Sequence, residues 1–156
     1  MQFSFSYDKK KVLQALRYHF VSRQEIRVMI ILVNVFALTS AALFYFKKIR
    51  PEPFFLGTFI WVMMMVSVWY ILPNIIYKKS STFKEAFTIN FSEHYIVLEN
   101  NRGYVNWEWS KFSKFIESPH FFHLYFDTKS FFLVPKDTMM DDDKHTVRGL
   151  LKEKIG

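Results

Sequence analysis

The chain has 156 residues, with 51% apolar residues, 20% aromatic residues, a formal net charge of +7 and no cysteine. The apolar content excludes an intrinsically disordered chain, and the lack of cysteine excludes disulfide bonds, thiol nucleophiles and cysteine-ligated zinc or iron–sulfur sites. All 21 basic and 14 acidic residues lie outside two long apolar runs, so the chain divides into apolar segments and polar flanks.

The N-terminal segment, residues 1–27, is predicted to form a short strand followed by an amphipathic helix. Phe3, Phe5 and Tyr7 alternate with small polar residues, which is the period of a half-buried strand. Asp8 can then cap a helix that runs to Val21, with apolar residues on one face and basic residues on the other. We expect this helix to lie along a membrane surface or against the C-terminal domain.

Six basic residues give this N-terminal segment a net charge of +4, whereas the segment from residue 77 onward has a net charge of only +1. The excess positive charge therefore lies beside the first apolar run, where contact with anionic lipid headgroups is expected. Nucleic acid is not expected as a partner, because the C-terminal domain does not carry this charge. The membrane-surface basic residues are Lys9, Lys10, Lys11, Arg17, Arg23 and Arg27.

The two apolar runs are predicted to form a transmembrane hairpin, residues 28–76. Residues 28–46 and 54–76 form uncharged runs of 19 and 23 residues, and about 20 apolar residues in a helix cross a hydrocarbon core about 30 Å thick. The alternatives are two core helices of a soluble domain and a cleaved signal peptide. Neither run shows a polar face, and a second span follows the first, which favours the hairpin. Pro73 is expected to kink or end the second helix.

The charges that flank the spans predict the orientation of the hairpin, since two spans place both termini on one side. The N-terminal segment has six basic residues and Lys78, Lys79 and Lys84 follow the second span, whereas the turn between the spans has three. Basic residues are enriched on the cytoplasmic side, so we expect both termini in the cytoplasm. The spans contain no acidic or basic residue, so neither a proton relay nor an ion pathway is expected.

The C-terminal domain, residues 77–156, is predicted to be a small antiparallel β-rich domain closed by a helix from Met139 to Lys154. Segments rich in aromatic and β-branched residues alternate with turn signals such as residues 100–103. Because a domain of 80 residues buries little core on its own, the N-terminal strand is expected to join its sheet. Strands are predicted over residues 83–91, 94–99, 104–109, 111–117, 121–126 and 131–134.

Short aromatic motifs in the C-terminal domain carry a resemblance to a known family. Residues 109–117 read WSKFSKFIE, residues 121–125 read FFHLY, and residues 131–136 read FFLVPK, with an apolar Leu150-Leu151 pair in the last helix. These motifs, and the order of parts over essentially the whole chain, resemble the YcxB-like family of bacterial membrane proteins. The resemblance implies an α+β membrane protein of the bacterial inner membrane, with a pleckstrin-homology-like (PH-like) domain carried on a two-helix hairpin. It implies no reaction.

The residue types that carry catalysis or bind metals show no recognisable spacing. The four glycines are scattered, so no phosphate-binding loop is predicted. His120 and His123 would point to opposite faces of a strand and could not share a metal. Asp141, Asp142 and Asp143 with His145 could form a cation site, but carboxylates at a helix N-terminus are also explained by the helix dipole. We therefore expect no enzymatic activity, no cofactor and no metal.

Trp107, Lys111 and Lys114 form the candidate contact site for a partner or for lipid. Trp107 and Trp109 are two residues apart, so on a strand they share a face, and core packing is the alternative interpretation for both. If Trp107 is exposed beside the two lysines, the three side chains form an aromatic and basic patch that faces the bilayer or a protein.

The sequence thus predicts a non-enzymatic integral membrane protein whose cytoplasmic PH-like domain mediates protein interaction at the inner membrane. The expected partner is another protein or further copies of this chain, in addition to the lipid bilayer. Two alternatives remain open. One is an immunity or defence accessory protein that protects the membrane against a toxin, and the other is a domain that senses anionic lipid.

Overall fold

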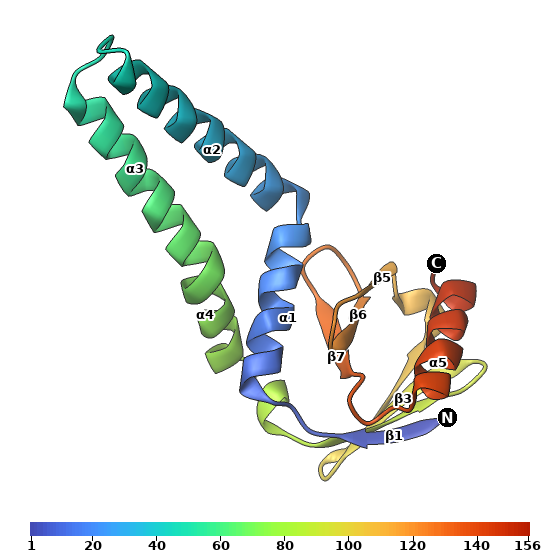
Figure 1. Cartoon of the computed structure of the whole chain (residues 1–156). Coiled ribbons are helices and arrows are strands. Elements are labelled where there is room, and N and C mark those ends of the chain that lie inside the picture. Colours follow the sequence, from blue (N-terminus) through green and yellow to red (C-terminus); the bar gives the residue numbers. More distant parts are fainter. The chain divides into compact units, whose positions relative to one another are not determined.

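The computed structural model describes residues 1–156, and the chain divides into two compact units. The first unit combines residues Met1–Ala15 with Ser80–Gly156, and the second contains residues Leu16–Lys79. Helix α1, Lys9–Ser22, begins in the first unit and continues into the second (Figure 1). Asp8 caps this helix as predicted, because its carboxylate accepts a hydrogen bond of 3.1 Å from the backbone N–H of Lys10.

The second unit contains the two long apolar helices predicted from the uncharged runs. Helix α2 spans Gln24–Tyr45, and a second continuous helical segment runs from Pro51 to Lys79. The segment comprises α3, Pro51–Val66, a π-helical turn over Ser67–Ile71, and α4, Leu72–Lys79. Both helices are long and apolar enough to cross a membrane. In the most apolar stretch of 18 residues, only 6% of the first helix and 11% of the second is buried. Core helices of a soluble domain would be mostly buried.

Small and polar side chains allow α2 and α3 to pack closely. Gly57 is buried, and a Cβ atom at that position would lie 3.0 Å from the ring of Phe36 and 3.6 Å from the hydroxyl of Ser40. The indole N–H of Trp61 donates a hydrogen bond of 2.9 Å to the side-chain oxygen of Asn34. Close backbone approach and interhelical hydrogen bonds are the usual means of helix association in a lipid environment.

The helix does not end at Pro73, which lies inside α4 directly after the π-helical turn. Proline has no N–H to donate to the carbonyl four residues earlier, which here is that of Trp69. The Nε atom of Arg17 donates a hydrogen bond of 2.7 Å to this carbonyl. The guanidinium carbon of Arg17 also lies 5.3 Å from the ring centroid of Trp69 and 5.5 Å from that of Tyr70. Arg17 thus satisfies the backbone group that Pro73 leaves without its helical donor.

Replacing Arg17 with alanine is expected to increase amide hydrogen exchange in residues 67–74 by about tenfold, because an unsatisfied carbonyl weakens the turn by about 1–2 kcal/mol. The measurement is hydrogen exchange with mass spectrometry on the full chain in detergent micelles. Arg17→Lys should restore little protection, because an ammonium group lacks the planar geometry for stacking and side-on donation. Equal exchange in the parent chain and in both variants would contradict this role of Arg17.

The first unit contains two antiparallel sheets and a C-terminal helix. The four-stranded sheet has the order β1-β2-β3-β4, and the three-stranded sheet has the order β5-β6-β7. The strands of the first sheet are β1 Gln2–Phe5, β2 Phe87–Phe91, β3 Tyr95–Asn100 and β4 Gly103–Glu108. Those of the second are β5 Lys114–Glu117, β6 Phe121–Tyr125 and β7 Phe131–Pro135, and helix α5 spans Asp141–Lys154.

The N-terminal strand joins the sheet of the C-terminal domain, as its alternating pattern and the small size of that domain predict. In β1, Phe3 lies opposite Ile89 and Phe5 opposite Phe87 of β2, in antiparallel register. Phe5 is buried, and the hydroxyl of Tyr7 donates a hydrogen bond of 2.7 Å to the carbonyl of Leu133. Burial raises the pKa of Tyr7, so the hydroxyl keeps the proton that it donates.

One continuous core joins the two sheets and α5. Its centre is formed by side chains that are fully buried, among them Ile89, Ile96, Phe122 and Leu124 from the strands. Val147 and Leu151 of α5 are also fully buried in this core, so the apolar side of the last helix packs against the two sheets. Three aspartates fill the first turn of α5, as the dipole argument predicts.

The structure corrects the predicted strands at two places. Residues 83–86 are not part of β2, since Thr82–Lys84 form a 3₁₀ turn and the strand begins at Phe87. Trp109–Lys111 form a second 3₁₀ turn between β4 and β5, where the sequence predicts strand on both sides of Ser110. In this turn the indole N–H of Trp109 reaches the carbonyl of Ser92 at 3.2 Å while the ring stays buried. Tertiary contacts thus override the local strand propensity.

Candidate functional site

Trp107, the central residue of the predicted contact patch, packs against the core. Its ring makes edge-to-face contacts with Phe112, Phe126 and Phe132, with centroid distances of 6.0, 5.1 and 5.3 Å. The side chain is half-buried, and Val105, on the same face of β4, is 49% exposed. Trp107 is therefore mainly a core residue that closes one margin of the two-sheet core, with an exposed valine next to it.

The structure does not bring the two predicted lysines together with Trp107. Lys114 lies opposite Tyr125 in the β5–β6 register, and its ammonium group lies 4.9 Å from the Tyr125 ring centroid. Trp107 instead contacts Phe132, which lies opposite Leu124. Because Leu124 and Tyr125 are adjacent on β6, they point to opposite faces of the sheet. The exposed side chain of Lys111 lies in the 3₁₀ turn between the sheets, so the three residues do not form one patch.

The basic residues of the N-terminal segment are divided among different contacts. Lys11 donates a hydrogen bond of 2.6 Å to the carboxylate of Asp137, and this contact raises the pKa of Lys11. Arg17 is held by Trp69 and Tyr70, as described above, and Arg23 lies 3.6 Å from the carboxylate of Glu25. The exposed basic side chains of the segment are those of Lys9, Lys10 and Arg27. Three of the six predicted membrane-surface basic residues are therefore engaged in contacts within the chain.

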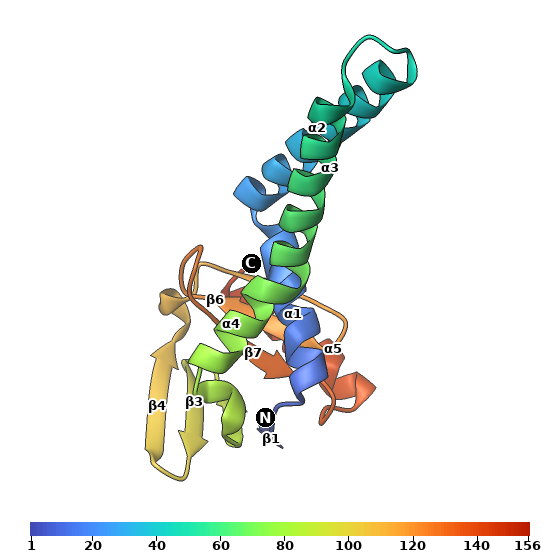
Figure 2. The same cartoon turned by 90° about the vertical axis from the view of Figure 1, so that its left-hand side faces the viewer.

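The most open element of the first unit is the edge strand β4. Every residue from Gly103 to Glu108 is exposed except Trp107, which is half-buried. β4 is the last strand of its sheet and pairs only with β3 (Figure 2). Asn100 and Gly103, on either side of the two-residue loop, form a hydrogen-bonded pair. In an antiparallel ladder every second residue is hydrogen-bonded to the neighbouring strand, so the backbone groups of Val105 and Trp107 also bond to β3. The backbone N–H and C=O groups of the residues between them, Tyr104, Asn106 and Glu108, therefore point to the open edge.

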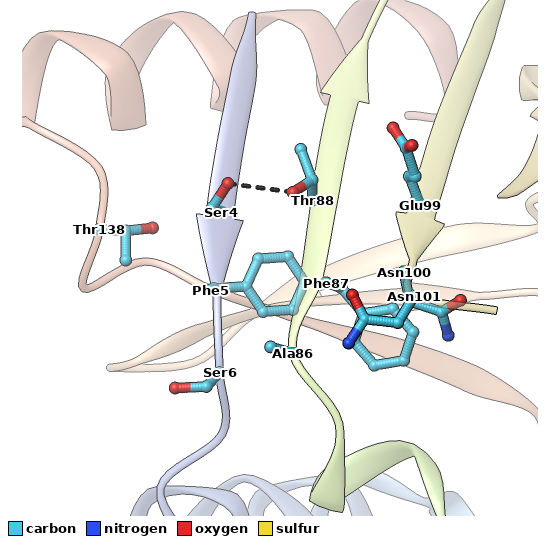
Figure 3. A pocket seen from close by; sticks show the side chains of 10 residues that line it. All are labelled: Ser4, Phe5, Ser6, Ala86, Phe87, Thr88, Glu99, Asn100, Asn101 and Thr138. Atoms are coloured by element: carbon cyan, nitrogen blue, oxygen red, sulfur yellow. Dashed lines mark hydrogen bonds between the residues drawn. The ribbon is translucent and has the colours of Figure 1, made fainter. Parts of the chain in front are cut away.

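A shallow pocket of about 600 Å³ lies across β1, β2 and β3 of the same sheet, and no residue of β4 lines it (Figure 3). Ser4, Thr88 and Glu99 occupy neighbouring positions on β1, β2 and β3, and the register continues to Tyr104 of β4. The hydroxyls of Ser4 and Thr88 are 3.0 Å apart. Thr138, from the loop after β7, forms the far wall of the pocket. The apolar residues Phe5, Ala86 and Phe87 also line the pocket, so its lining is partly polar and partly apolar.

A second depression of about 300 Å³ shares Asn100 and Asn101 with the first and extends to the β3–β4 turn. Here Glu85 accepts a hydrogen bond of 3.1 Å from Asn100 and lies 3.2 Å from the guanidinium of Arg102. The side chain of Arg102 is 80% exposed at the end of β4. The two depressions thus offer hydroxyl, amide and carboxylate groups, with two exposed cationic side chains, Lys84 and Arg102, at one end.

A hydrogen-bonded serine and histidine occur elsewhere in the domain, at a position that sequence reasoning missed. The Nε2 atom of His123 lies 2.8 Å from the hydroxyl of Ser118, and both side chains are buried. Ser118 also donates to the carbonyl of Phe121 at 3.3 Å, so the pair holds the β5–β6 turn. A nucleophilic serine needs access to substrate, and the narrow cleft that Ser118 lines is too small to hold a water molecule.

An ion cluster around Glu117 explains two of the sequence motifs that carry the family resemblance. Glu117 accepts hydrogen bonds from Arg148 of α5 at 2.6 and 2.7 Å, and from Lys136 at 2.9 Å. Hydrogen bonds from Arg148, and then those from Lys136 with the attraction of both charges, lower the pKa of Glu117 to about 2. Glu117 ends the WSKFSKFIE motif and Lys136 ends the FFLVPK motif, so the two motifs meet at this carboxylate.

Comparison with known proteins agrees with these motifs. Residues 91–151 match the model of a family described as YcxB-like protein, which covers about two fifths of the chain and leaves out the N-terminal segment and both apolar helices. No curated protein and no solved structure matches the chain. The matched stretch contains Trp109, Glu117, Lys136 and Arg148. The stretch from residue 91 to residue 151 is thus similar to the YcxB-like protein family, which confirms the resemblance drawn from its motifs.

Proposed function

We propose that this chain is a non-enzymatic integral membrane protein whose C-terminal domain, with a PH-like fold, mediates protein interaction at the bacterial inner membrane. The observation that carries the proposal is the open edge of β4, which pairs only with β3 and is exposed along almost its whole length. An open strand edge binds another polypeptide through backbone hydrogen bonds, and the neighbouring side chains provide specificity.

The exposure of apolar side chains on α2 and α3 supports insertion in a membrane. Ile31, Leu38 and Phe59 are 61%, 72% and 62% exposed. Each buried apolar side chain of this size contributes about 1.5–3 kcal/mol on leaving water, so many exposed ones together favour a lipid environment strongly. The backbone polar groups of the helices are satisfied internally, which a membrane requires.

The pairing of β1 with β2 supports a topology with both termini on one side. Residues 1–15 and 80–156 form one folded unit, and the two apolar helices lie between these segments in the sequence. A hairpin that crosses the membrane twice returns the chain to the side where it started, which this pairing requires. The distribution of basic residues favours the cytoplasm for that side.

The chemistry of the exposed surface supports a protein partner more than an anionic lipid. The larger depression is lined by hydroxyl and amide groups, by the carboxylate of Glu99 and by the apolar residues Phe5, Ala86 and Phe87, and no lysine or arginine lines it. An anionic headgroup is bound by clustered basic residues, whereas amides and hydroxyls complement the backbone and polar side chains of a polypeptide. Lys11, Arg17 and Arg23 are also engaged in internal contacts.

Photo-crosslinking in cells tests the proposal. A photo-reactive residue at Tyr104, which is 71% exposed on β4, is expected to form a discrete protein adduct of the full-length chain. The matched control is the same residue at Thr128, which is exposed in the β6–β7 loop and should give no discrete protein adduct. Lipid adducts alone at Tyr104 would favour the lipid-sensing alternative, and the absence of any protein adduct at native expression would contradict the proposal.

A further inference from the structure

The backbone of β4 lacks the features that protect edge strands from pairing with another strand. Natural edge strands carry lysine, proline or a bulge, or are covered by another element. β4 contains no lysine and no proline, and its register with β3 is continuous over residues 103–108. At the opposite edge of the sheet, β1 has only four residues. β4 is therefore the edge of this sheet that is best suited to accept another strand.

We propose that β4 pairs with β4 of a second copy of this chain, antiparallel and related by a two-fold axis at Asn106. This inference rests on the proposed function and names the partner. Tyr104, Asn106 and Glu108 present outward N–H and C=O groups, and antiparallel pairing joins outward residues to one another. Only the register centred on Asn106 pairs all three of them, with Tyr104 opposite Glu108 of the partner copy.

The register with the two-fold axis at Val105 is less favourable than the register with the axis at Asn106. With the axis at Val105, Glu108 would lie opposite Arg102 of the second copy. The backbone N–H of Arg102 already donates to the side-chain oxygen of Asn100 at 2.9 Å, within the β3–β4 turn. That register would leave backbone groups of Glu108 without a partner, which is costly in a closed interface. The register centred on Asn106 uses only groups that β4 leaves open.

The side chains of β4 are complementary to themselves in the proposed register. Val105 of one copy lies opposite Trp107 of the other, which covers an exposed valine and the accessible part of a half-buried tryptophan. Such aromatic and β-branched cross-strand pairs are among the favourable ones. On the other face, Tyr104 lies opposite Glu108, whose carboxylate can accept its phenolic hydrogen.

The charges at the two ends of β4 also favour antiparallel self-pairing. Arg102 precedes the strand and Glu108 ends it, so the antiparallel arrangement places the positive end of one copy beside the negative end of the other. Arg102 and Glu108 of the two copies become diagonal neighbours, within reach of long side chains. A parallel arrangement would instead place like charges together.

Attachment to a membrane allows the small β4–β4 interface to form a dimer. A ladder of five residues buries less area than a stable dimer of soluble proteins normally requires. Two copies confined to one membrane surface meet at a high effective concentration, which raises the occupancy of a weak contact without additional contacts. The proposed pairing would then depend on the density of the protein in the membrane.

Engineered cysteines test the pairing, because the chain contains no cysteine of its own. In full-length protein in membranes, Asn106→Cys is expected to form a disulfide-linked dimer under mild oxidation, since the paired Cα atoms lie about 5.5 Å apart. Membranes containing Tyr104→Cys and Glu108→Cys chains together should give a mixed dimer, in at least fivefold excess over the dimer from Tyr104→Cys alone. Thr128→Cys, at the exposed tip of the β6–β7 loop, is the matched control and should stay largely monomeric.

A proline variant separates pairing from folding. Asn106→Pro removes an outward N–H that β3 does not use, and proline is tolerated on edge strands. It should reduce the dimer fraction in nanodiscs loaded with two or more copies by at least fivefold, while the core tryptophan fluorescence is retained. Dimer yields at Asn106→Cys no higher than those of Thr128→Cys would overturn the proposal. A different protein captured at Tyr104 would leave the proposed function intact and overturn self-pairing alone, whereas no protein adduct would contradict both.

Discussion

Removal of residues 1–6 should prevent the domain that follows the two apolar helices from reaching its folded state. β1 forms the backbone hydrogen bonds with β2 along one edge of the sheet. It also contributes the ring of Phe5, whose centroid lies 6.1 Å from that of Phe87 and 6.5 Å from that of Phe132. Loss of a buried phenylalanine side chain alone costs about 3–5 kcal/mol. Since a small domain has a total stability of about 5–15 kcal/mol, the loss of the strand as well removes most or all of it.

Limited proteolysis of the full chain in detergent micelles measures this effect. We expect cleavage within residues 80–156 to be at least a hundredfold faster in the truncated chain than in the parent. Phe5→Leu, which keeps an apolar side chain, should be intermediate, and Ser4→Ala, at an exposed position of the same strand, should behave like the parent. Equal protease resistance of the truncated and parent chains would show that the C-terminal domain folds without β1.

Replacing Glu117 with glutamine should lower the free energy of unfolding by about 2 kcal/mol at pH 7. The pKa of Glu117 falls from an ordinary value of 4.5 to about 2 in the folded chain, and each unit corresponds to about 1.4 kcal/mol. Solvent reaches the cluster, because the side chain of Glu117 is 27% exposed, and screening reduces the full value. Glutamine also leaves the ammonium of Lys136, whose side chain is only 11% exposed, without its charged partner.

The same substitution should remove one part of the dependence of stability on pH. A carboxylate with a lowered pKa stabilises the folded chain fully above its unfolded value, here about pH 4.5, and this stabilisation is lost as the pH falls toward 2. Urea unfolding in detergent micelles between pH 3 and 7, followed by tryptophan fluorescence, measures this slope. Glu153→Gln is the control, since that side chain is 71% exposed near the end of α5. An unchanged slope in Glu117→Gln would contradict the assignment.

Local patterns in the sequence predict most of the fold. The alternation of Phe3, Phe5 and Tyr7 predicts β1, the uncharged runs predict α2 and the Pro51–Lys79 helix, and the aromatic segments predict the remaining strands. Patterns of this kind depend on near neighbours along the chain. The 3₁₀ turn at Trp109 is different, because its conformation follows from a hydrogen bond to Ser92 and from stacking of the indole on the ring of Phe91 in β2.

The candidate surface could not be predicted to the same extent, because it depends on which side chains are exposed. The sequence left open whether Trp107 is exposed or packs in the core, and its spacing from Trp109 does not decide between the two. In the structure Trp107 packs against Phe126 and Phe132, and Lys114 lies on the other face of the second sheet. That β4 lies at an edge depends on the order of all strands in the sheet, which residue periodicity does not contain.

The pairing of β1 with β2 also constrains how the protein is made. Residues 2–5 leave the ribosome first, but their partner residues 87–90 are synthesised only after both apolar helices. Synthesis at about 5–20 residues per second leaves the N-terminal strand without its partner for several seconds, while the two apolar helices are being made. An open apolar strand is prone to misfolding in that interval. The first half of the sheet must therefore stay unpaired until the second half of its domain has been synthesised.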